Sequence, residues 1–136
     1  GIGNLFERVF TMIKNYNIDL SKNNIDGEIS KLIVGANLEI KQSFDDFKLF
    51  EVLKNILLFS KKLDKYVDDK KPWVLAKENN PELETVLISL YFGIKSMIDW
   101  LEPFMPSKIA QTKEYMAKLE SNTLKDDEKL GLFPRM

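Results

Sequence analysis

An asparagine and an arginine lie four residues apart near the start of the chain, in Gly3-Asn4-Leu5-Phe6-Glu7-Arg8. On a helix this spacing places both side chains on one face, about one turn apart, so they can converge on one ligand. Asn4 offers a donor and an acceptor, and Arg8 offers a planar fork of donors. The pair suits the edge of an unpaired base together with a phosphate. The alternative is that Arg8 forms an ordinary surface ion pair with Glu7 or a neighbouring helix.

A second candidate site is the step Lys71-Pro72-Trp73, where a proline interrupts the helical pattern. Trp73 lies in a turn beside Lys70 and Lys71, away from the apolar stripes of the long helices. Single-stranded RNA loops are recognised by stacking bases on aromatic side chains, with basic side chains along the backbone. Lys70 and Lys71 are therefore candidate RNA backbone contacts. The alternative is that Trp73 fills a gap between helices, as we expect for Trp100, which follows an apolar stripe.

The composition removes most enzyme chemistry. The 136 residues include no His and no Cys, which excludes the usual general base, a thiol nucleophile, thiolate zinc sites and disulfides. We therefore predict no catalytic residue, no metal site and no cofactor in this chain. The acidic clusters Asp45-Asp46 and Asp126-Asp127-Glu128 are interpreted as a helix cap and a solvated tail.

Net charge and hydropathy limit the kinds of partner that we expect for this chain. With 20 basic and 21 acidic residues, the chain does not resemble proteins that coat nucleic acid through bulk charge. A local basic patch remains between residues 61 and 77, where six lysines face three aspartates. There is no apolar run of the roughly 18 to 20 residues that span a bilayer, and no charged leader precedes one. We expect a cytoplasmic protein with no membrane partner.

Apolar residues recur at helical spacing along the chain, and no alternating strand pattern competes. Helices are expected over residues 3–16, 26–42 with Asp26 as N-cap, 47–67 with a cap from Ser43, Asp45 or Asp46, 73–77, 82–101 after a cap at Asn79-Asn80-Pro81, and 106–119. In the third, the inward stripe runs through Leu49, Leu53, Ile56, Ser60, Leu63 and Val67. These patterns predict an all-α fold, an antiparallel bundle of about five helices.

Several short motifs now fall in one order: Asn4 and Arg8 on the first helix, Lys65-Tyr66-Val67-Asp68, Lys71-Pro72-Trp73, Pro103-Phe104-Met105-Pro106 and Leu132-Phe133-Pro134-Arg135. In this order they resemble the helical, C-terminal anticodon-binding domain of methionyl-tRNA synthetase, a class I aminoacyl-tRNA synthetase. The resemblance implies a domain that docks the anticodon loop of methionine tRNA, so that the acceptor end reaches the catalytic domain. It also implies that Asn4, Arg8, Pro72 and Trp73 read the anticodon.

The resemblance carries further expectations. The family's catalytic domain, which uses ATP and Mg²⁺, has a His-containing signature, so a chain without His lacks it. The opening Gly-Ile-Gly, with no initiator Met, is what we expect of a piece of a longer protein. Residues 1–120 would form the anticodon-binding domain, and the tail 121–136 would pack on the enzyme body. One position departs from the family, because Asp64 replaces its usual Asn.

Two other interpretations remain open at this stage. The chain could be the equivalent domain of another class I synthetase, which recognition of the methionine anticodon would distinguish. It could also be a helical protein-interaction module that holds a partner helix in an apolar groove, with Phe104 and Met105 in the lining. That interpretation predicts an exposed groove and indifference to RNA.

Overall fold

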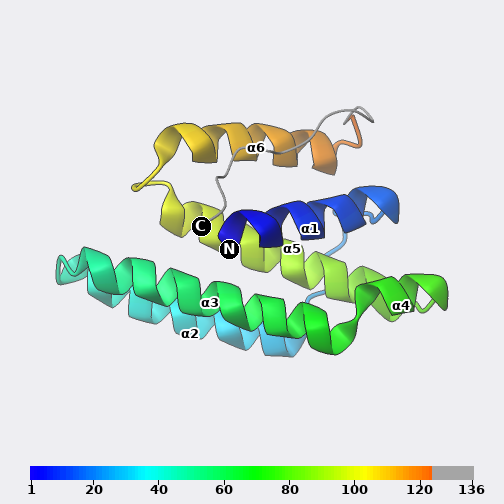
Figure 1. Cartoon of the computed structure of the whole chain (residues 1–136), viewed down its shortest axis with the longest axis horizontal. Coiled ribbons are helices and arrows are strands. Elements are labelled where there is room, and N and C mark those ends of the chain that lie inside the picture. The colour runs from blue at the N-terminus through cyan, green and yellow to red at the C-terminus, as the bar shows by residue number, and fades with distance from the viewer. Residues whose placement is uncertain (124–136) are drawn as a thin grey trace.

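The computed structural model describes residues 1–123, and within them all the regular secondary structure is helical, with no strand (Figure 1). Six helices follow in order: α1 (Ile2–Asn15), α2 (Gly27–Asp45), α3 (Leu49–Lys70), α4 (Pro72–Lys77), α5 (Glu82–Leu101) and α6 (Pro106–Glu120). Five are long, and α4 is a short helix of six residues. The predicted all-α bundle is therefore confirmed, with boundaries within about three residues of those expected.

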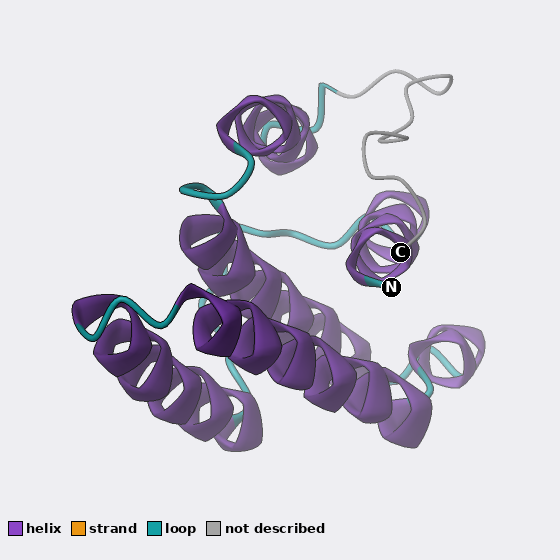
Figure 2. Cartoon of the chain, turned by 60° about the vertical axis from the view of Figure 1, so that its left-hand side comes forward, coloured by secondary structure: helices purple, strands orange, loops and turns teal. Residues whose placement is uncertain are grey.

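Helix α5 is the centre of the bundle, since it packs against each of the five other helices. Its stripe through Leu87, Leu90, Ile94 and Met97 has no exposed surface. Complete burial of an apolar side chain contributes roughly 1.5 to 3 kcal/mol, so this stripe is the main source of cohesion. Figure 2 shows the long α2 and α3 as a neighbouring pair, with the other helices to one side of it.

Close packing fixes α3 against α5. A Cβ atom at Gly93 would lie 3.0 Å from Leu63 Cδ1, so a larger residue there would require the Leu63 side chain to shift by a few tenths of an ångström. Leu63 and Ile56 on α3 have no exposed surface. The predicted α3 stripe is wrong at its first member, however, because Leu49 is 53% exposed and Val52 lies in the core instead.

The predicted helix caps divide into those that form and those that do not. Asp26 accepts a hydrogen bond from the Glu28 backbone N–H, as expected of an N-cap. Asn80 likewise accepts one from the backbone N–H of Glu82. The predicted cap of α3 is wrong, because Asp45 ends α2 and the residue before α3 is Lys48, which makes no side-chain cap.

Two predictions about the end of the chain, the solvated acidic cluster Asp126-Asp127-Glu128 and the returning segment Leu132-Phe133-Pro134-Arg135, lie outside the described residues. Within the part that is described, no helix is long and apolar enough to cross a membrane.

Candidate nucleic-acid interface

Arg8 and Trp73, predicted from separate motifs, lie against each other. The Arg8 guanidinium carbon is 5.3 Å from the centroid of the Trp73 ring, within the range of a cation–π contact. Arg8 projects from α1 and Trp73 from the start of α4. Trp73 keeps 41% of its surface exposed, so it does not fill a gap between helices. The contact holds the indole beside a positive charge while part of the ring stays open to solvent.

Arg8 also forms the interhelical ion pair that the alternative interpretation expected. Its Nη2 atom lies 3.6 Å from Asp68 Oδ1 on α3, with the two side chains 43% and 68% exposed. At such exposure an ion pair contributes at most about 1 kcal/mol to stability. The pair therefore orients the guanidinium more than it stabilises the fold, and the same group is shared between Asp68 and Trp73.

The turn that presents Trp73 is set by its two preceding residues. Lys71 has a φ of 49°, in the left-handed region, and its backbone N–H closes the last turn of α3 on the Val67 carbonyl at 2.9 Å. Pro72 has no N–H to continue that helix, and its fixed φ suits the first residue of α4. Pro72 is buried and anchors the turn in the fold, whereas Trp73 and Lys71 are exposed.

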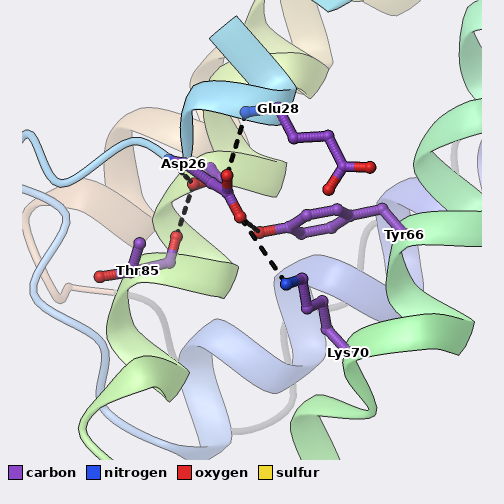
Figure 3. A network of polar contacts seen from close by, with 6 residues as sticks. Asp26, Glu28, Tyr66, Lys70 and Thr85 are labelled. Carbon is purple, nitrogen blue, oxygen red and sulfur yellow. Dashed lines mark hydrogen bonds and ion pairs between the residues drawn. The ribbon is translucent and has the colours of Figure 1, made fainter.

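A polar network anchors the end of α3 just before this turn (Figure 3). The carboxylate of Asp26 accepts a hydrogen bond from the Tyr66 hydroxyl at 2.9 Å and lies 4.0 Å from Lys70 Nζ. The backbone N–H of Asp26 donates to Ser89 Oγ on α5 at 2.7 Å. The Glu28 N–H and the Tyr66 hydroxyl hold the pKa of Asp26 below its usual value. Of the two candidate backbone contacts, Lys70 is thus tethered to the fold.

Asn4 is exposed on the same helix, one turn before Arg8. Asp64, the departure from the family, lies half-buried on α3, near enough to Arg8 for the two charges to interact. Burial raises its pKa, an effect that the positive charges of the Gly1 ammonium and Arg8 oppose and that Asp68 reinforces. Two carboxylates therefore neighbour the single guanidinium, which limits the attraction of this face for phosphate.

The sequence gives no signal for three of these contacts. The pairing of Arg8 with Asp68, the tether of Lys70 to Asp26 and the stacking of Arg8 on Trp73 all join helices distant in the chain. Helical spacing relates residues within one helix only, so such contacts depend on how the helices pack. Within residues 1–123, no three acidic side chains gather closely enough to hold a metal ion.

Phe104 and Met105, the candidate groove residues of the protein-interaction interpretation, are half-buried against the core. Phe104 stacks on Phe44 of α2 with the ring centroids 5.9 Å apart. The turn between α5 and α6 is therefore packed against α2 through Phe104. Both side chains therefore contribute to the packing of the fold, which is what a structural turn requires.

These observations define a class of protein: an all-α domain that presents a half-exposed tryptophan held by an arginine. Comparison with known proteins narrows this class to one family. The methionine–tRNA ligase 1 of Alkaliphilus oremlandii is 28% identical over 121 residues, which is 88% of this chain and 22% of that protein. The Clostridium acetobutylicum methionine–tRNA ligase is 31% identical over 112 residues, 77% of this chain and 17% of the relative. The Methanocella arvoryzae enzyme is 31% identical over 106 residues, 78% of this chain and 15% of its own length.

No protein-family model matches the chain. The relatives nevertheless confirm the resemblance drawn from the motifs: this chain is related to a part of the methionyl-tRNA synthetases. It spans only about a fifth of the length of those relatives.

Proposed function

We propose that this chain is an anticodon-binding module that recognises the anticodon loop of methionine tRNA. The observation that carries the proposal is the Arg8 guanidinium held 5.3 Å from the half-exposed Trp73 ring. A splayed base gains roughly 1 to 3 kcal/mol by stacking on an aromatic side chain, and it needs a ring that is both exposed and fixed. The Arg8 contact fixes the ring, and its partial exposure leaves area for the base.

Within this proposal each residue has a role. Trp73 stacks on an anticodon base, and the buried Pro72 fixes the direction in which the indole leaves the turn. Arg8 supplies donors for a base edge or phosphate, and Asn4, one turn away, supplies both a donor and an acceptor. Lys71 is exposed at the turn and contacts the RNA backbone, whereas Lys70 contributes through its charge because Asp26 holds its side chain.

In the longer protein the domain would position methionine tRNA for a separate catalytic domain, which joins methionine to the tRNA with ATP and Mg²⁺. The chain's own contribution is to bind and orient the RNA. The near-neutral net charge means that binding relies on the patch between residues 61 and 77 for its electrostatic part. Release of counterions from phosphates makes that part dependent on salt.

A binding measurement with short RNA hairpins tests the proposal. One hairpin carries the methionine anticodon, and the others carry single base changes in it. We expect the matched hairpin to bind roughly 5- to 150-fold more tightly than each changed one, since one good base contact contributes about 1 to 3 kcal/mol of discrimination. Equal binding of all hairpins would reject anticodon reading. Tighter binding of a different anticodon would assign the domain to another class I synthetase.

A further inference from the structure

The last turn of α3, residues 66–70, takes part in both the core and the RNA site. Tyr66 is 3% exposed and lies in the core. Asp68 is exposed, and its Oδ1 atom lies 3.6 Å from Arg8 Nη2 on α1. The turn that presents Trp73 follows directly. The position of residues 66–70 therefore determines where the Arg8 guanidinium and the Trp73 ring can meet.

The Tyr66 hydroxyl ties this turn to the rest of the fold through Asp26 (Figure 3). It donates to Asp26 Oδ2 at 2.9 Å, while Asp26 Oδ1 accepts from the Glu28 N–H at 3.0 Å. The Asp26 N–H donates to Ser89 Oγ at 2.7 Å, and Ser89 Oγ donates to the Thr85 carbonyl at 2.6 Å. The end of α3 is thereby joined to the start of α2 and to the central helix α5.

The hydrogen bond between Tyr66 and Asp26 is strong because its acceptor is ionised. The Glu28 N–H and the Tyr66 hydroxyl lower the pKa of Asp26, so its carboxylate is charged at neutral pH. Burial, and then the Asp26 carboxylate, raise the pKa of Tyr66, so its hydroxyl keeps the proton and is the donor. A hydrogen bond to an ionised group is roughly twice as strong as one between neutral groups. Loss of this bond therefore loosens the end of α3.

Lys70 is the weakest member of the same network. Its Nζ atom lies 4.0 Å from Asp26 Oδ2 and 5.7 Å from the centroid of the Tyr66 ring, and the side chain is partly exposed. An ion pair of this length at such exposure contributes little to stability. The anchor of the α3 end is therefore the Tyr66 hydroxyl, and the charge of Lys70 adds little to it.

We propose that Tyr66 and Asp26 are positioning residues of the RNA site. Their hydrogen bond holds the last turn of α3, and through Asp68 it keeps the Arg8 guanidinium on the Trp73 ring. The inference rests on the proposed function, since it assigns that ring to anticodon reading. A base that stacks on a ring already fixed in place loses less freedom on binding, so fixing the ring increases affinity.

The substitution Tyr66→Phe tests the proposal because it removes the hydroxyl and leaves the ring. Its matched control is Tyr91→Phe, since Tyr91 is 2% exposed and its hydroxyl donates to the Met116 carbonyl at 3.4 Å, between α5 and α6. Hairpin binding is measured well below the thermal midpoints of both variants. We expect Tyr66→Phe to weaken binding of the matched hairpin roughly three- to tenfold, which is part of the effect of one good base contact. Tyr91→Phe should weaken it by less than about twofold.

A double-mutant cycle separates positioning from general destabilisation. In the Trp73→Ala background the ring is absent, so adding Tyr66→Phe should weaken hairpin binding by less than about twofold. Equal weakening with and without the Trp73 ring would overturn the positioning role. Equal weakening by Tyr66→Phe and Tyr91→Phe would overturn it as well, because any lost buried hydroxyl would then have the same effect.

A measurement without RNA makes the two possible failures distinguishable. With 5-fluorotryptophan in place of tryptophan, ¹⁹F NMR gives separate resonances for Trp73 and Trp100, which Trp73→Phe assigns. We expect Tyr66→Phe to shift or broaden the Trp73 resonance and to leave that of Trp100 unchanged, and Tyr91→Phe to leave the Trp73 resonance unchanged. An unaltered Trp73 resonance in Tyr66→Phe, in a chain that distinguishes the hairpins, would reject the positioning role alone. Failure of the unmodified chain to distinguish the hairpins would reject the proposed function and the positioning role with it.

Discussion

The two tryptophans lie in opposite surroundings. Trp100, near the end of α5, is 7% exposed, meets Phe59 edge-on at 5.0 Å and donates from Nε1 to Asn37 Oδ1 at 3.1 Å. Within the fold, its apolar ring is packed and its indole N–H is hydrogen-bonded. Trp73 is 41% exposed and lies against the charged group of Arg8. Packing accounts for Trp100 but leaves much of the Trp73 ring unused, and this difference is why we place RNA at Trp73.

The largest expected effect comes from the buried ring. Trp100→Ala should lower the free energy of unfolding by about 3 to 5 kcal/mol, because it leaves a cavity in the core. Denaturant unfolding followed by circular dichroism measures this loss. Trp100→Phe keeps most of the packing and serves as the control, with a smaller loss. A loss below about 1 kcal/mol for the alanine variant would show that Trp100 is not a core residue.

The exposed ring should show the reverse pattern. Trp73→Ala should weaken binding of the matched hairpin by about 1 to 3 kcal/mol, while the free energy of unfolding changes by less than about 1 kcal/mol. Val74→Ala is the matched control, since Val74 is the next residue of α4 and is 38% exposed. If Trp73→Ala unfolds the domain as readily as Trp100→Ala does, the contrast between the two rings fails.

Arg8 is expected to act through its shape as well as its charge. Arg8→Lys keeps the charge but loses the planar fork and most of the stacking on Trp73, so hairpin binding should weaken by about 1 kcal/mol. The control is Lys65→Gln, which removes a charge from the exposed, ion-paired Lys65 of α3. That variant should reduce the salt dependence of binding with little change in anticodon discrimination. Unchanged hairpin binding by Arg8→Lys would mean that only the charge of Arg8 matters.

The smallest effect is expected at Asp64. Because burial raises its pKa, the folded state holds the Asp64 carboxylate less favourably than the unfolded chain does. Asp64→Asn should therefore stabilise the fold slightly at neutral pH, and removing a negative charge beside Arg8 should tighten hairpin binding by roughly two- to fivefold. For the same reason, binding by the unmodified chain should strengthen as the pH falls toward the raised pKa, and binding by Asp64→Asn should not. Hairpin titrations of both proteins at several pH values measure this effect. Binding by the unmodified chain that stays constant or weakens as the pH falls would contradict the prediction.

The sequence is sufficient to predict the helices but not all of their faces. The stripe through Leu87, Leu90 and Ile94 identifies α5 because its apolar spacing is unbroken, and Asp26 identifies the start of α2 because a capping residue acts locally. The end of α2 is harder to predict. Its left-handed residue is Phe47, which lacks the glycine or asparagine signal of such an ending. The predictions that Ser43, Asp45 or Asp46 caps α3 and that Leu49 lies in the core are wrong for this reason.

The sequence predicts which residues form the candidate site but not how they contact one another. The spacing of Asn4 and Arg8 and the Pro72-Trp73 step single out the residues, since each depends on local geometry. That Arg8 lies on Trp73 while also facing Asp68 depends on the packing of α1 against α3, which helical periodicity does not encode. The roles of these residues in reading RNA remain predictions.

The most direct test of the central claim is a tryptophan fluorescence titration with the matched hairpin and with the hairpins that carry one changed anticodon base. Trp100 is buried and should contribute a constant background, so quenching reports on Trp73. The account predicts quenching by the matched hairpin alone, and its loss in Trp73→Phe. Quenching that persists in Trp73→Phe, or binding of the matched hairpin without any quenching, would contradict the claim that a base stacks on Trp73.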